Sequence, residues 1–135
     1  MGKFVSTTTK LTIAGVDLSN HVETATLTSV VDEVESTAFG ATYHDFLTGL
    51  AANMLAVVFH QDYGIASVQQ TIWPLVNTTT TFSLNPTGSA NSTINPSYTG
   101  NILIANWTPI DANVGQLGKI SANWKVVSAI TQVTT

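Results

Sequence analysis

The segment from Leu50 to Val76 constrains the fold most, because an apolar run and a change of hydrophobic period stand side by side in it. Asn53 to Phe59 is almost entirely apolar and is long enough for one buried strand. After the turn residues 61–64, apolar residues recur three, four and three positions apart, at Ile65, Val68, Ile72 and Leu75. We therefore expect a central strand followed by a short helix on the edge or face of a sheet.

The other apolar segments have the pattern of strands. The clearest alternation is at 119–126, where apolar residues occupy every second position: Ile120, Ala122, Trp124 and Val126. The Thr-rich runs 22–31 and 78–84 suit a pleated, half-buried surface, because many of their side chains are β-branched. Shorter strands are expected at 11–13, 98–107 and 128–135, with a long connecting loop at 85–97. The length suits one domain over residues 1–135, with one helix among many strands.

Residues 36–49 interrupt this pattern. The segment contains two glycines and has no clean period, which predicts a long loop or a protruding hairpin. Long loops inside a compact domain are usually functional. Four of its side chains are too apolar for a loop in free solvent and predict contact with another subunit: Phe39, Tyr43, Phe46 and Leu47. The only acidic cluster of the chain, Asp32, Glu33 and Glu35, comes just before it.

The composition argues against several classes of protein. Charged residues make up 9% of the chain, against about 25% in an average soluble domain. Eight acidic residues, four lysines and no arginine argue against tight nucleic-acid binding. A surface of Thr, Ser and Asn gives little electrostatic repulsion between copies. It suits a chain that copies of itself cover, or equally a secreted or thermotolerant β-domain with an uncharged surface. No apolar span is long enough for a membrane helix, and the absence of cysteine excludes disulfides and thiolate metal sites.

No combination of residues predicts catalysis. The three histidines, His21, His44 and His60, lack a second ligand at the spacing of a metal site. There is no nucleophile-elbow serine and no glycine-rich phosphate loop. The acidic cluster has the composition of an acid–base pair, but a solvated strand end explains it better. Three tryptophans, at 73, 107 and 124, fit either a sugar-binding face or core and interface positions, and we favour the latter. We therefore expect a protein that is not an enzyme, with no catalytic residues, cofactor or metal.

Several short motifs occur together in a recognisable order. They are Gly15-Val16-Asp17-Leu18-Ser19-Asn20-His21-Val22, Asp32 to Gly40, Gly49-Leu50, Phe59-His60-Gln61-Asp62-Tyr63, Trp73-Pro74-Leu75 and Asn95-Pro96-Ser97-Tyr98-Thr99-Gly100. Over residues 10–105 the chain resembles the major tail tube proteins of phages with long, non-contractile tails. It departs from them at Asn53, where such proteins tend to have an aromatic residue, and after Val126.

The resemblance implies a mainly β fold, an antiparallel β-sandwich or barrel with one flanking α-helix and a long protruding loop, here residues 36–49. It implies a structural virion protein that forms stacked hexameric rings, assembled in the host cytoplasm, through which genomic DNA is delivered. Asp32, Glu33 and Glu35 are then expected to face the lumen, where acidic groups help double-stranded DNA to pass without specific binding.

The partners that the resemblance implies are other copies of the chain and the tape-measure, tail terminator and distal tail proteins, with no membrane. Two alternatives remain open from the sequence. One is another virion protein, in head–tail joining or decoration. The other is a monomeric β-sandwich that binds carbohydrate or a host surface.

Overall fold

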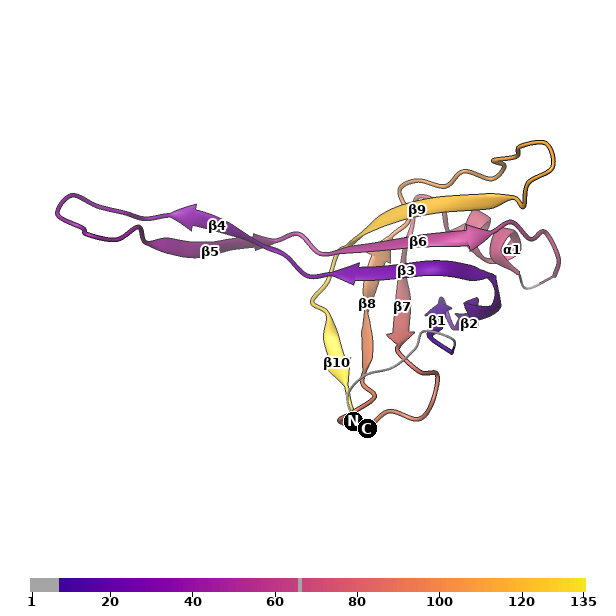
Figure 1. Cartoon of the computed structure of the whole chain (residues 1–135), viewed down its shortest axis with the longest axis horizontal. Coiled ribbons are helices and arrows are strands. Elements are labelled where there is room, and N and C mark those ends of the chain that lie inside the picture. The colour runs from indigo at the N-terminus through magenta and orange to yellow at the C-terminus, as the bar shows by residue number, and fades with distance from the viewer. Residues whose placement is uncertain (1–7, 66) are drawn as a thin grey trace.

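The computed structural model describes residues 8–65 and 67–135, in which one antiparallel sheet curves around a shared core and a hairpin extends away from it (Figure 1). The strand order of the large sheet is β2-β1-β7-β8-β9-β6-β3, and β10 pairs with β8. The strands are β1 (Lys10–Ile13), β2 (Val16–Asp17), β3 (Val22–Thr28), β6 (Met54–His60), β7 (Thr79–Asn85), β8 (Ser97–Leu103), β9 (Lys119–Val126) and β10 (Thr131–Val133). The mainly β, sandwich-like fold class is confirmed.

The sheet turns a corner between β8 and β9. Only two residue pairs join these strands, Ile102 with Val126 and Leu103 with Lys125. Residues 97–99 at the start of β8 pair with β10 instead. As a result β3, β6 and β9 form one wall that runs across the wall made by β7, β8 and β10 (Figure 1). Apolar side chains between crossed walls form the core, as in orthogonally packed sheets.

The predicted central strand is confirmed as β6, which pairs with β3 on one side and β9 on the other. Alternate residues of β6 and β9 point into the core and are almost completely buried, as the period-two pattern predicts. The buried set includes Leu55, Val57, Phe59, Ile120, Ala122, Trp124 and Val126. The core therefore lies on the inner face of the wall from which the hairpin extends.

One α-helix flanks the sheet, and it is shorter than the apolar spacing predicts. Helix α1 (Val68–Ile72) buries Val68 and Ile72, and a 3₁₀ turn (Trp73–Leu75) follows. The expectation that Ile65 belongs to the buried helical face is wrong, since its side chain is 94% exposed. A turn precedes the helix, because the hydroxyl of Ser67 donates to the backbone oxygens of Asp62 and Gly64.

Two tryptophans and a phenylalanine connect the helix to the core. Phe59, Trp107 and Trp124 have ring centroids 5.8–6.3 Å apart. The indole N–H of Trp107 donates to the side chain of Gln69 on α1, and that of Trp124 to the backbone oxygen of Asn106. The predicted core role is therefore confirmed for these two tryptophans. Trp73 is half exposed and is not a core residue, so an interface position stays a prediction for it.

The strand expected over 22–31 is shorter in the structure. Strand β3 ends at Thr28, and residue 31 already belongs to the hairpin. Ser29 and Val30, between the two strands, belong to neither of them. None of the helices in the described ranges has the length and hydrophobicity that a transmembrane segment requires.

Candidate subunit interface

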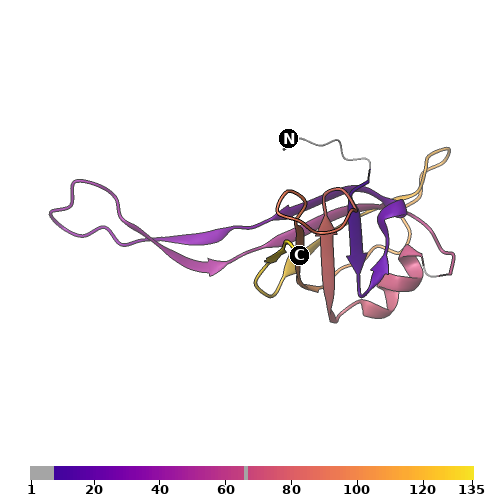
Figure 2. The same ribbon diagram turned by 90° about the horizontal axis from the view of Figure 1, so that it is seen from below.

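The hairpin, which we call the arm (residues 29–52), consists of β4 (Val31–Glu35), β5 (Phe46–Ala51) and their connections. Among the described residues its strands pair only with each other, in a separate two-stranded sheet. Both views show it projecting well beyond the body (Figures 1 and 2). The protruding segment predicted at 36–49 is therefore present, but it is longer at both ends and contains two paired strands of five and six residues. An isolated two-stranded hairpin is marginally stable in water, so a partner surface would stabilise it.

The two faces of the arm differ in chemistry. Val34 lies opposite Leu47 on one face, while Glu33 and Glu35 lie opposite Thr48 and Phe46 on the other. Gly49 lies on the Val34 side, where a Cβ atom would meet side-chain atoms of Asp32 and Val34 at 3.3–3.4 Å. The Val34–Leu47 face therefore has apolar side chains together with Asp32, whereas Glu33 and Glu35 lie on the other face with Phe46.

Local hydrogen bonds close the tip of the arm. The backbone N–H of Ser36 donates to the carbonyl of Asp45 at 2.7 Å, and that of Asp45 donates to the hydroxyl of Thr37 at 2.9 Å. His44 Nδ1 lies 2.7 Å from Glu35 Oε1. The 36–45 connection is therefore a folded loop with its own contacts, although its side chains are exposed to solvent.

A single asparagine anchors the arm to the body. Asn53 is 7% exposed, and its side-chain oxygen accepts a hydrogen bond from the N–H of Val30 at 3.1 Å. Its backbone oxygen accepts from the N–H of Val126 on β9 at 2.9 Å, and the N–H of Ala52 donates to Val30 at 2.7 Å. Asn53 therefore connects both strands at the root of the arm to the wall of the sheet. Sequence reasoning missed this role, because the residue reads as one polar interruption of an apolar run.

All four predicted contact residues lie on the arm and are exposed: Phe39, Tyr43, Phe46 and Leu47. They do not form one cluster, because Phe46 and Leu47 lie on opposite faces of β5 and the other two lie in the tip loop. Val34 and Leu50, which were not predicted, add to the same exposed apolar set. Their contact with another subunit stays a prediction.

The acidic cluster also lies on the arm. Asp32, Glu33 and Glu35 belong to β4, and all are exposed. With Asp45 they are four of the eight acidic residues of the chain, whereas the arm contains none of the four lysines. The arm is therefore strongly negative, and the rest of the chain has a formal charge near zero. That these acids face a lumen stays a prediction.

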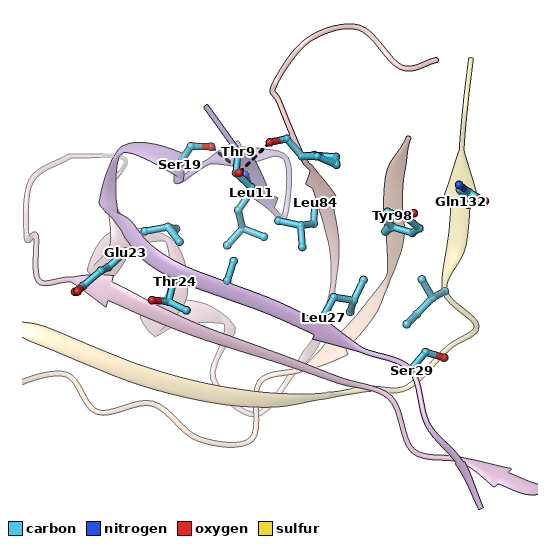
Figure 3. Close-up of a pocket in the computed structure, with 14 residues that line it drawn as sticks. Thr9, Leu11, Ser19, Glu23, Thr24, Leu27, Ser29, Leu84, Tyr98 and Gln132 are labelled. Atoms are coloured by element: carbon cyan, nitrogen blue, oxygen red, sulfur yellow. Dashed lines mark hydrogen bonds between the residues drawn. The ribbon is translucent and has the colours of Figure 1, made fainter. Parts of the chain in front are cut away.

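A groove lies along the open side of the body, between β3 and the opposite wall (Figure 3). Its volume is about 690 Å³. Apolar side chains form much of its floor: Leu11, Val22, Ala25, Leu27, Leu84 and Ile130. Among the described residues that line it, Glu23 is the only charged one. Strand β3, which borders the groove, ends the described sheet and pairs on one side only. The sequence gives no direct sign of this groove, since strands distant in the chain form it.

Ion pairs gather at the end of the wall remote from the arm. Glu23 lies 3.0 Å from Lys119 and 3.6 Å from His60, and His21 lies 3.3 Å from Asp62. The hydrogen bond from Lys119 holds the pKa of Glu23 below its ordinary value. Within the described ranges, no three His, Asp or Glu side chains are placed to bind a metal ion. These exposed pairs explain the positions of His21 and His60 without a catalytic role.

Comparison with known proteins finds similarity among solved structures. No protein-family model matches the chain, and no curated protein does. Among solved structures, the chain is similar to a hybrid structure of the SPP1 tail tube from solid-state NMR and cryo-EM, with a TM-score of 0.76. The match covers 98% of this chain and 80% of that one, at 13% identity. This chain has the fold of a tail tube protein.

The tail tube fold agrees with the resemblance read from the sequence motifs. At 13% identity the likeness establishes the arrangement of the strands and not the details of a surface. The surfaces through which copies of this chain associate are therefore sought in its own arm and groove.

Proposed function

We propose that this protein is the structural subunit of a phage tail tube. Copies associate side by side into hexameric rings, and the rings stack into a tube through which genomic DNA passes to the host. The observation that carries the proposal is the arm, a hairpin that forms a sheet separate from the body among the described residues and has large exposed apolar side chains. Exposed apolar surface of this kind marks an interaction site.

The charge distribution supports the conducting role. The chain has no arginine and a formal net charge of −4. A lumen built from such a chain offers few cations to bind phosphate, so double-stranded DNA slides through it without being held. We place Asp32, Glu33 and Glu35 among the acidic groups that the DNA or a neighbouring ring meets. No enzymatic step, cofactor or metal is part of this function.

The proposal includes the other partners of such a tube. The tape-measure protein occupies the lumen during assembly, and the terminator and distal tail proteins close the two ends. The protein is then located in the virion tail and assembles in the cytoplasm of the host bacterium. Self-association is the part of this scheme that the chain alone can test.

Deleting residues 37–48 tests the role of the arm in self-association. The shortened protein is expected to keep the circular dichroism and thermal unfolding of a folded β protein, because the core contains no residue of the arm. In size-exclusion chromatography with light scattering it is expected to remain monomeric at concentrations where the full chain polymerises.

A pair of point variants provides a matched control. Phe39 at the tip of the arm and Val114 in a distant loop are both fully exposed. Phe39→Asp is expected to raise the critical concentration for polymerisation by a factor of at least ~10. Val114→Asp is expected to raise it by a smaller factor. Equal polymerisation by the full chain and the deletion variant would remove the arm from the proposal.

A further inference from the structure

The groove beside β3 has an apolar floor that the described residues leave partly uncovered. Leu27, Leu84 and Ile130 pack against the core but are only partly buried. They line the groove together with Leu11, which is fully buried. Contiguous apolar surface of this kind marks a site at which a further chain segment packs.

The chain passes this groove at Thr9. Thr9 belongs to the lining, and its hydroxyl donates to the backbone oxygen of Pro86, which also lines the groove, at 2.9 Å. Figure 3 shows Thr9 next to Leu11, with Leu27 on the strand that faces them. Residues 1–7 lie outside the described part of the chain. Because the chain is held at Thr9, this segment is joined to the body beside the groove.

The sequence of this segment provides an apolar side chain at a suitable distance. Residues 1–7 are Met-Gly-Lys-Phe-Val-Ser-Thr, in which Phe4 and Val5 precede an uninterrupted run of Ser and Thr over 6–9. Phe4 is five residues from Thr9, so an extended chain carries it up to about 17 Å from the rim. Burial of an aromatic side chain removes about 150–250 Å² of surface from water. Phe4 can therefore reach the floor and cover part of it.

The charges of the segment and of the groove are opposite. Lys3 is the single charged side chain of residues 1–9. Glu23 is the single charged one among the described residues that line the groove. Its carboxylate lies 3.0 Å from Lys119 Nζ, and a carboxylate accepts more than one donor. A segment with one cation next to one aromatic side chain, as at residues 3 and 4, is therefore complementary to this groove.

Connection through the chain selects the segment of the same molecule. A short tether gives the tethered group an effective concentration on the order of millimolar. A segment from another copy reaches that concentration only in a very concentrated solution. The segment of the same chain therefore outcompetes it in dilute solution.

We propose that residues 1–7 dock in the groove of their own chain, with Phe4 on the apolar floor and Lys3 beside Glu23. The docked segment shields the floor from water and from other molecules in the unassembled protein. This inference goes beyond the tail tube function and does not depend on it.

NMR spectroscopy of the full chain, below the concentration at which it polymerises, tests the docking. In uniformly labelled protein we expect nuclear Overhauser effects from the ring of Phe4 to methyl groups of Leu27, Leu84 or Ile130. A sample that mixes labelled and unlabelled copies is the control for contacts between molecules, and it should show no such effect between copies. Effects between copies only, or no effect from Phe4 to any methyl group of the groove, would overturn the inference.

A pair of substitutions provides a second measurement. Phe4→Ser removes the apolar anchor, so it should shift the methyl signals of the groove and increase the fluorescence of ANS, a dye that binds exposed apolar surface. Val114→Ser removes an exposed side chain from the loop between β8 and β9, which does not line the groove, and should do neither. The described core does not include Val114, so its loss does not report on unfolding. Unchanged methyl signals and unchanged dye fluorescence in Phe4→Ser would contradict the docking.

Discussion

Replacing Asn53 with alanine should destabilise the root of the arm and lower the free energy of unfolding. The substitution removes the side-chain oxygen that accepts from the N–H of Val30, while the backbone bond to Val126 stays. An unsatisfied, partly buried donor costs about 1–3 kcal/mol. Val30 is half exposed, so water reaches part of the site and the lower half of that range applies. We expect a loss of about 1–2 kcal/mol, which lowers Tm by about 3–8 °C for a domain of this size.

Thermal unfolding and amide hydrogen exchange measure the two consequences of this substitution. The N–H of Ala52, which donates to Val30 across the root, should exchange faster in Asn53→Ala, whereas the amides of β9 keep their protection. Asn101→Ala is the matched control, because that side chain is exposed, and it should change the stability by less than about 0.5 kcal/mol. Unchanged Tm and unchanged exchange at Ala52 would refute the anchoring role of Asn53.

Three further variants test the core, the ion pairs and one turn. Trp124→Ala should lower the free energy of unfolding by about 3–5 kcal/mol in urea titration, because the side chain is 1% exposed. The hydrogen bond from Lys119 lowers the pKa of Glu23, so the charged carboxylate stabilises the fold at neutral pH. This stabilisation is lost as the pH falls through the folded-state pKa of Glu23. The Tm of Glu23→Gln should therefore fall less steeply than that of the unmodified protein as the pH is lowered. Gly88→Ala should destabilise the fold, because the residue has a φ of +74° and its new Cβ would lie 2.7 Å from the backbone oxygen of Thr8.

Local patterns in the sequence predict the core wall well. The alternation at 119–126 matches the burial of β9 residue by residue, and the apolar run at 53–59 becomes the central strand β6. Both predictions succeed because each strand of this wall presents one face to a continuous core, so period two has a direct physical cause. The prediction for Ile65 is wrong although its spacing suits a helix. Hydrogen bonds to Asp62 form a turn there, and the helix begins only at Val68.

The assembly surfaces were only partly predictable. Apolar residues in an irregular segment indicated the arm, but its strand pairing depends on a register between Val31–Glu35 and Phe46–Ala51 that no single segment determines. The groove and the anchor at Asn53 depend on contacts between residues far apart in the chain, such as Leu27 and Ile130 in the groove lining. Tertiary arrangement, rather than local propensity, determines these features.

Electron microscopy of the purified full chain at increasing protein concentration tests the central claim most directly. The account predicts rings that stack into tubes, with each arm in contact with another subunit. A monodisperse monomer at high concentration, with the arm free or folded back on its own body, would contradict it.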